Sequence, residues 1–176
     1  MEDNNIFILE EWLDQGYIDM AIISEQPGLS YDWVPLIEDP FVVVCNANNP
    51  IAKRGSITID QLTHENVAVF RSHMRDDPDT AQWMKYLPKD LNSNYASNSD
   101  FTMMRLIEEN DIMVVVPELF AEYAEKHYNV KICTLDIEAS RKLGIAIRDK
   151  KRMSPAAEKF LSCSKEVILS ASSTIK

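Results

Sequence analysis

Apolar runs along the chain predict several buried strands. FVVVC at 41–45 and IMVVV at 112–116 have no polar break, which is typical of strands that are buried on both faces of a parallel sheet. Trp33 to Ile37 is predicted to be a second extended piece, joined to 41–45 by a hinge at Asp39–Pro40. Shorter apolar runs predict further strands at 18–23, 67–70, 130–135 and 143–147.

Other segments place their apolar residues at helical spacing. Residues 8–13 predict a short helix that Gly16 closes as its C-cap. The helix predicted at 118–127 has one apolar side, made of Leu119, Phe120, Tyr123 and Ala124. The last helix begins at Ser154–Pro155, and its inward face is predicted to hold Phe160, Leu161, Val167 and Ile168. Asp77 and Pro78 predict the start of another helix that ends before Pro88.

The segment from Ser97 to Pro117 reads as a helix that leads directly into a buried strand. Asn98 or Ser99 is predicted to cap the helix, and Asp100 adds a negative charge that the helix dipole favours. Asn110 is predicted to end it in the left-handed conformation. The start of a helix in an α/β fold can present free N–H groups to a cleft, so we expect the function to reside there.

Composition and charge narrow the class of protein. The 176 residues are 45% hydrophobic and 26% charged, as in a globular protein of one domain or two small lobes. No apolar run approaches the ~20 residues that cross a bilayer, and the N-terminus lacks a signal-peptide pattern. The net charge of −10 opposes direct binding to nucleic acid; the basic run at 148–152 reads as a solvated loop. Three widely spaced cysteines indicate reduced thiols in a cytoplasm.

Motifs for catalysis, cofactors and metals are not found. Four glycines are too scattered for a phosphate-binding loop, and the three histidines have no zinc-site spacing. The acidic cluster Asp76, Asp77 and Asp79 lacks the glycine and distal glutamate of a calcium loop, so we interpret it as capping of the next helix. Nothing nearby supports Cys45 and His73 as a nucleophile and its base. We therefore expect no enzyme activity, cofactor or metal.

Five segments, in order, resemble the effector-binding domain of LysR-type transcriptional regulators. They cover nearly the whole chain: LDQGYIDMAII (13–23), FVVVCNANNPIA (41–52), SITIDQL (56–62), Thr102 to Pro117, and MSPAAEKFL (153–161). Three positions depart from the family pattern. Asn49 replaces a histidine, while Asn110 and Ile112 replace two glycines that follow the helix.

This resemblance implies an α/β, periplasmic-binding-protein-like fold (type 2), in which two α/β lobes enclose a ligand cleft. Lobe I would comprise residues 1–45 and 142–176 without its first strand–helix–strand unit, and lobe II residues 46–141. Chain crossings near 46–50 and 138–141 would act as hinges. The family's winged helix-turn-helix would precede Met1, so we expect an N-terminally truncated form and a homodimer of non-standard geometry.

The resemblance also places the ligand site where strand ends and helix starts face the cleft. The candidate ligand-binding residues are Ser24, Phe70, Arg71, Ser72, Asn98, Ser99 and Thr102. Arg71 either pairs with a carboxylate effector or forms a surface salt bridge with Asp76 or Asp77, and the sequence leaves both open. Asn98 and Ser99 act as caps whether or not they also contact a ligand.

The expected partner is a small-molecule effector, with DNA contacted only through the N-terminal domain and no membrane involved. Two other interpretations stay open at this point. One is a stand-alone small-molecule binding protein of similar fold. The other is a non-functional remnant of a truncated reading frame.

Overall fold

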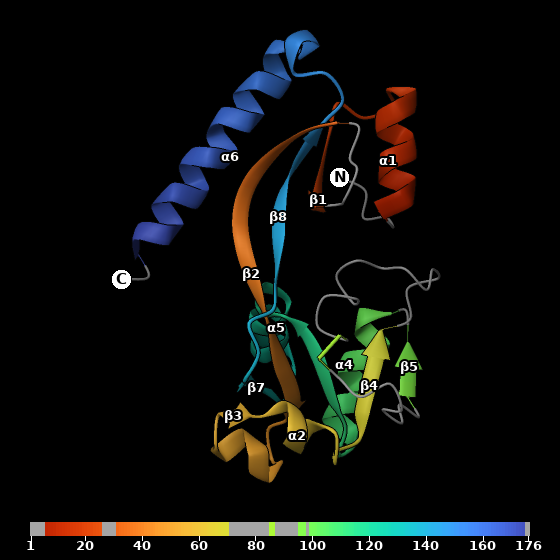
Figure 1. Cartoon of the computed structure of the whole chain (residues 1–176), viewed down its shortest axis with the longest axis vertical. Coiled ribbons are helices and arrows are strands. Elements are labelled where there is room, and N and C mark those ends of the chain that lie inside the picture. Colours follow the sequence, from red (N-terminus) through yellow and green to blue (C-terminus); the bar gives the residue numbers. More distant parts are fainter. Residues whose placement is uncertain (1–5, 26–30, 71–84, 87–94, 98, 175–176) are drawn as a thin grey trace. The chain divides into compact units, whose positions relative to one another are not determined.

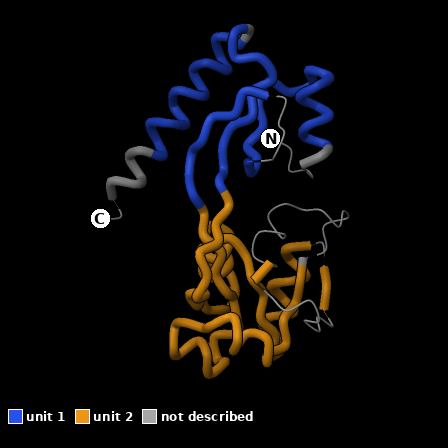
Figure 2. The backbone as a smooth tube through the Cα atoms, in the orientation of Figure 1, with its two compact units in different colours: residues 1–38, 142–176 blue, residues 39–141 orange. Residues whose placement is uncertain are grey.

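A computed structural model describes residues 6–25, 31–70, 85–86, 95–97 and 99–174. The backbone divides into two compact units (Figure 2). Unit 1 combines Met1–Glu38 with Lys142–Lys176, and unit 2 is the continuous segment Asp39–Arg141. The first division therefore lies between Glu38 and Asp39, earlier in the chain than the 45/46 division that the sequence suggested. The helix predicted from Asp77 lies largely outside the described residues.

Unit 1 is a sheet between two helices. Its strand order is β1–β8–β2, and β1 pairs antiparallel with β8 from Met20↔Ile147 to Ser24↔Leu143. Figure 1 shows α1 and α6 on opposite sides of these strands. The elements are α1 (Ile6–Gln15), β1 (Met20–Ser24), the first part of β2 (Asp32–Asn46), most of β8 (Ser140–Ile147), the 3-10 helix η2 (Lys150–Arg152) and α6 (Pro155–Thr174).

Each face of this sheet has its own apolar cluster. Leu13 of α1 packs with Ala21, Ile23 and Ala146 on one face. Leu161 of α6 packs on the opposite face with buried residues Val34, Ile145 and Ile147. Gly16 ends α1 with a φ of 74°, which confirms it as the left-handed residue that follows the helix.

The inward face predicted for α6 is half wrong. Ala157 and Leu161 are buried, but Phe160 is 49% exposed and Val167 is 64% exposed. The apolar residues of α6 extend around more of the helix than the sheet covers, and apolar spacing alone cannot show which part of a wide stripe meets the core.

Unit 2 is built around a sheet with both parallel and antiparallel pairs. The later part of β2 pairs antiparallel with both β6 and β7, while β4 pairs parallel with β6 and β5. β3 pairs parallel with β7. The remaining elements are the 3-10 helix η1 (Pro50–Lys53), β3 (Ser56–Ile57), α2 (Ile59–Leu62), β4 (Val67–Phe70), β5 (Tyr95–Ser97), α4 (Asp100–Glu109), β6 (Met113–Pro117), α5 (Glu118–His127) and β7 (Val130–Leu135).

Both faces of this sheet are covered, as the unbroken apolar runs predicted, but the parallel pairing expected for 41–45 is wrong, because this part of β2 is antiparallel to β6 and β7. In β2, Phe41, Val43 and Cys45 join a cluster with Ile51 of η1 and Leu62 of α2. The alternate residues Val42 and Val44 join a second cluster that holds the inward side chains of α4 and α5: Met103, Met104, Ile107, Ala121 and Ala124. The inward face predicted for α5 is therefore partly wrong, because small alanines pack there while Leu119 and Tyr123 are exposed.

The two extended pieces predicted on either side of Asp39–Pro40 form one strand of 15 residues, β2, and the boundary between the two units falls within it, between Glu38 and Asp39. Pro40 is exposed and lies within the strand. Proline lacks a backbone N–H, but a strand accepts it wherever that N–H is not needed for pairing. The next residue, Phe41, donates its N–H to the carbonyl of Ala139 at 3.1 Å.

Candidate functional site

The parallel strands β4 and β5 bring two of the predicted regions together in unit 2. Their register pairs Ala68 with Tyr95 and Phe70 with Ser97. The carboxyl ends of both strands therefore meet at one edge of the sheet, and α4 starts there three residues after Ser97. Strand ends and helix starts of this kind form ligand sites in α/β folds.

Serine hydroxyls organise the start of α4. Ser99 is the N-cap, and its Oγ accepts the Thr102 N–H at 3.4 Å. Ser97 Oγ accepts the Ser99 N–H at 3.0 Å and also lies 3.2 Å from the Ser99 carbonyl oxygen, to which it can donate. Ser97 is a residue that the sequence-based site did not include. It stabilises the turn that places Ser99.

The exposed part of this helix start is suited to polar recognition. Thr102 is exposed on the first turn, and the ring of Phe101 is 65% exposed. The N-terminal end of a helix carries partial positive charge and N–H groups that lack intrahelical acceptors. Hydroxyl, aromatic and N–H groups together can orient a small ligand that has hydrogen-bond acceptors, whereas Asp100 supplies a negative charge at the same turn.

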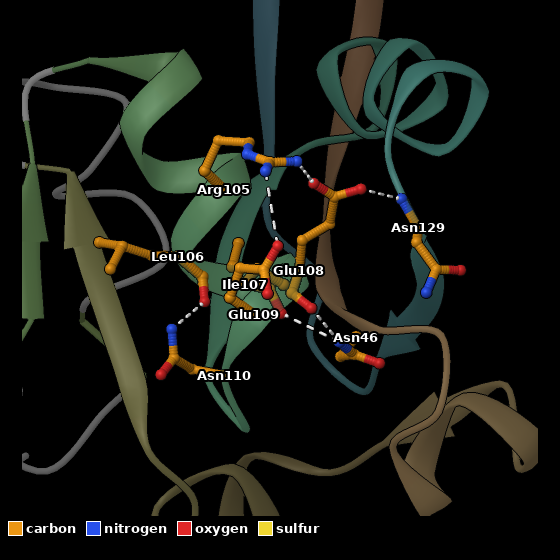
Figure 3. Close-up of polar contacts among 8 residues, drawn as sticks. All are labelled: Asn46, Arg105, Leu106, Ile107, Glu108, Glu109, Asn110 and Asn129. Carbon is orange, nitrogen blue, oxygen red and sulfur yellow. Dashed lines mark hydrogen bonds and ion pairs between the residues drawn. The ribbon is translucent and has the colours of Figure 1, made fainter.

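The opposite end of α4 is fixed by side chains from other elements (Figure 3). Asn46 Nδ2 donates to the carbonyls of Ile107 and Glu108, and Glu108 Oε1 accepts the Asn129 N–H at 2.7 Å. These bonds join the helix to the end of β2 and to the residue before β7. They satisfy carbonyls at the helix end and so fix the position from which α4 presents Ser99.

The prediction of a left-handed Asn110 is wrong. Asn110 has extended backbone angles, φ −136° and ψ 162°. Its side chain closes the helix instead, because Nδ2 donates to the Leu106 carbonyl at 2.8 Å. Asn46 adds the further donors, so the helix needs no residue of positive φ at this end.

The predicted ligand-binding residues fall into three groups. Ser99 and Thr102 lie together at the start of α4, and the backbone of Phe70 lies at the adjoining strand end. Ser24 is buried at the end of β1 in unit 1. The remaining predicted residues, Arg71, Ser72 and Asn98, lie outside the described residues, as do His73 and the acidic cluster at 76–79.

Asp39 is a buried acid whose position in the sequence predicted only a hinge. Its side chain is 0% exposed and forms an ion pair with Arg141, whose Nε and Nη2 each lie 2.9 Å from Oδ2. The second oxygen, Oδ1, accepts the Leu119 N–H at 3.0 Å. Pro117, the N-cap of α5, makes no side-chain capping bond, so Asp39 supplies that acceptor from β2. The sequence carried one signal of this role, because aspartate is uncommon within a strand.

Two buried thiols lie in contact within unit 2. Cys45 Sγ and Cys133 Sγ are 3.8 Å apart, and both residues are 0% exposed. The contact with Cys133, together with burial, raises the pKa of the Cys45 thiol far above its ordinary value. Cys45 is therefore a neutral packing residue rather than a nucleophile.

Removing the cap at Ser99 tests the local construction of this site. Ser99→Ala is expected to lower the free energy of unfolding by ~1 kcal/mol, because the Thr102 N–H loses its acceptor. Urea unfolding measures the change. Ser99→Asp is the matched control, since aspartate caps as well as serine and should keep the stability near that of the native chain. Equal stability of the alanine variant and the native chain would show that the cap contributes nothing.

A family model, the LysR substrate binding domain, matches residues 5–168. The chain belongs to this family. The LysR domain is 28% identical over 131 residues to the uncharacterized HTH-type transcriptional regulator YbhD of Escherichia coli (strain K12). That match covers 74% of the chain and 41% of the relative, so the chain spans well under half of that regulator's length.

Solved structures establish the fold of this LysR domain. The effector binding domain of QuiR in complex with shikimate is 20% identical, with a TM-score of 0.76 over 93% of this chain and 78% of that one. The regulatory domain of Synechocystis PCC6803 CcmR in complex with 2-PG is also 20% identical, with a TM-score of 0.75 over 94% and 80% of the two chains. The predicted α/β, periplasmic-binding-protein-like class is confirmed. No helix in the described part of the chain is long and apolar enough to span a membrane.

Proposed function

We propose that this LysR substrate-binding domain senses a small-molecule effector on behalf of a transcriptional regulator. The observation that carries the proposal is the family match over residues 5–168, supported by the similar fold of two domains solved with small molecules bound. Regulation requires only that the effector favour one arrangement of the protein by ~1–3 kcal/mol. The chain acts as a binding module without enzyme activity or a cofactor.

The effector is a small carboxylate. The start of α4 supports this class of ligand, because a helix N-terminus and the hydroxyls of Ser99 and Thr102 favour an anionic group with acceptor oxygens. Arg71, which directly follows β4 in the sequence, supplies the planar pair of donors that a carboxylate accepts. The other residues that the sequence predicts as ligand-binding, Phe70, Ser72, Asn98 and Ser24, stay part of this proposal on the sequence alone.

The regulator that contains this domain works in the cytoplasm and contacts DNA through a separate winged helix-turn-helix domain. The net charge of −10 supports the proposal that this chain makes no direct nucleic-acid contact. This chain itself forms a non-standard or weak homodimer.

Ligand-induced stabilisation tests the proposed function. In a thermal unfolding screen of small carboxylates that includes shikimate, one or more should raise the Tm by several degrees when present at ~100 times its Kd. Arg71→Ala should weaken that ligand about 10-fold to 100-fold, the range expected for losing hydrogen bonds to a charged group. Titration calorimetry measures the Kd of both proteins.

Arg105→Ala is the matched control for this experiment. It also removes an arginine from unit 2, but one whose half-exposed side chain is paired with Glu108 on α4. Its Kd should equal that of the native chain. Unchanged binding by Arg71→Ala would remove Arg71 from the site, and a screen in which no carboxylate raises the Tm would contradict the proposed class of effector.

A further inference from the structure

Three sulfur-containing side chains from neighbouring strands lie on one face of the unit 2 sheet. Cys45 of β2 pairs directly with Met113 of β6 in the strand register, and Cys133 lies on β7, the strand on the other side of β2. All three residues belong to one buried cluster and therefore share a face of the sheet. The two cysteines are 88 residues apart in the sequence, so spacing along the chain does not reveal the group.

The two thiols are in contact but are badly placed for a disulfide. Their Sγ atoms are 3.8 Å apart. In the register of β2 with β7, Cys133 lies opposite Val43 and Cys45 lies opposite Lys131, so the cysteines are diagonal neighbours. Diagonal positions are ~7–8 Å apart, beyond the ~6.8 Å Cα separation that ordinary disulfides reach. A direct S–S bond would therefore require the two strands to move together.

A metal ion between the two sulfurs fits this geometry better. Two metal–sulfur bonds of ~2.3 Å in a straight line hold their sulfurs ~4.6 Å apart. The two thiols, at 3.8 Å, need to separate by only about 0.8 Å to reach that span. The thioether of Met113, at the end of a side chain with three rotatable bonds, can approach the same ion as a third ligand.

The ligands and their burial select a soft divalent ion of low coordination number. Thiolate and thioether sulfurs favour soft metals. Among the described residues no three His, Cys, Asp or Glu side chains are grouped, whereas a structural Zn²⁺ takes four such ligands. Two thiolates neutralise a divalent ion, but a monovalent ion would leave a net charge within an apolar cluster, which is costly. The mercuric ion is soft, divalent and two-coordinate with thiolates.

We propose that Cys45, Cys133 and Met113 form a site for a soft divalent metal ion, with the two thiolates as its main ligands. Binding of Hg²⁺ breaks both S–H bonds, forms two Hg–S bonds and releases two protons to solvent. No oxidant is needed, because neither the sulfurs nor the metal change oxidation state. The bound ion ties β2 to β7. The site is separate from the start of α4, so its tests are independent of the proposed effector binding.

A short element covers the thiols and provides the route for the metal. Cys133 Sγ lies 3.6 Å from the carbonyl oxygen of Ile51 in η1, which has only four residues. Asn49 caps η1 by accepting the Ile51 N–H at 2.7 Å, and its Nδ2 donates to Asp111. Short segments open locally far more often than a whole domain unfolds. Opening of η1 is therefore the step that admits the ion, and the bonds of Asn49 set its rate.

Titration of the Cys163→Ser chain with mercuric chloride tests the site, because Cys163 is exposed while the other two cysteines are buried. Native mass spectrometry should find one Hg²⁺ per chain and the loss of two protons. The Tm should rise by about 5 °C or more, since a bridge between β2 and β7 constrains the chain as a disulfide does. Zinc chloride at the same concentration should neither bind nor raise the Tm.

Three variants in the Cys163→Ser background distinguish a bridge from attachment to one thiol. Cys45→Ala and Cys133→Ala each keep a single buried thiol, so mercury should not raise the Tm of either. Met113→Leu keeps both thiols and nearly the same core volume. It should lower severalfold the glutathione concentration that removes half of the bound ion, and an unchanged value would remove Met113 from the site.

Asn49→Ala tests the route, with Asn48→Ala as its matched control. Loss of the Asn49 side chain removes the cap of η1, so the buried thiols should bind mercury about fivefold faster or more. Asn48 is the exposed neighbour in the same turn, and its replacement should leave the rate unchanged. Stopped-flow absorbance of the thiolate-to-mercury charge-transfer band measures both rates. Equal rates in the two variants would contradict entry through η1.

Four results would overturn the proposed site. One is a Cys163→Ser chain that binds mercury only after it has been unfolded. Another is a fall in Tm on binding, which would show that the ion forces the core apart. The third is a stoichiometry of two ions per chain or equal binding of Zn²⁺. The last is a native chain isolated with Cys45 and Cys133 already joined in a disulfide, which would leave no thiol to bind the metal.

Discussion

Asp39→Ala is expected to lower the free energy of unfolding by ~3–5 kcal/mol, because it removes one partner of a buried ion pair. The substitution leaves the Arg141 guanidinium, itself only 21% exposed, without its carboxylate. It also takes the acceptor from the Leu119 N–H at the start of α5. Urea unfolding of the native chain and the variant measures the difference.

Two further variants show whether the pairing causes this loss. Glu125→Ala breaks the exposed pair with Lys131 and should cost less than ~1 kcal/mol. Asp39→Ala combined with Arg141→Met removes both charges of the pair and should be more stable than Asp39→Ala alone, because the guanidinium that lost the Asp39 carboxylate is removed with it. A double variant less stable than the single one would mean that Arg141 stabilises the protein by another route.

Gly144→Val is expected to destabilise unit 1 by about 3 kcal/mol or more, through overpacking. A Cβ atom at Gly144 would lie 2.3 Å from Cε2 of Trp33 and 2.6 Å from the backbone oxygen of Val34. The ring can shift only by disturbing the cluster under α1, and the carbonyl can shift only with its strand. Thermal unfolding followed by circular dichroism measures the loss.

Gly55→Ala is the matched control for this substitution. Gly55 has a φ of 70°, but no atom lies within 4 Å of the position that its Cβ would take. Alanine there should cost only the ~1–2 kcal/mol of a left-handed backbone. If Gly55→Ala proved as damaging as Gly144→Val, the close approach of Trp33 would not be the cause of the Gly144 effect.

Local rules predicted most elements of this fold from the sequence. Gly16 ends α1, Ser99 caps α4, and the helix expected at 118–127 has those bounds. These features depend on residues close together in the chain, so spacing and capping chemistry are enough to find them. The family resemblance then supplied the architecture, which no local pattern contains.

The errors arose where distant residues decide the outcome. Asn110 stays extended because Asn46, more than sixty residues earlier, donates to the carbonyls at the end of α4. Asp39 is part of a continuous strand because Arg141 and α5 satisfy its carboxylate. For the site, residue types could place Ser99 and Thr102 at a helix start, but the role of Ser97 depends on the pairing of β4 with β5.

During synthesis on the ribosome, unit 2 is complete before unit 1, although unit 1 begins first in the chain. Unit 2 is continuous from Asp39 to Arg141, whereas the sheet of unit 1 needs β8 between β1 and β2. At ~5–20 residues per second, β1 and the start of β2 emerge several seconds before β8. Unit 2 can therefore complete its core before β8 is available to pair with β1 and the start of β2. During that interval the nascent chain exposes the strand edges that β8 later pairs with, and exposed edges of this kind promote aggregation.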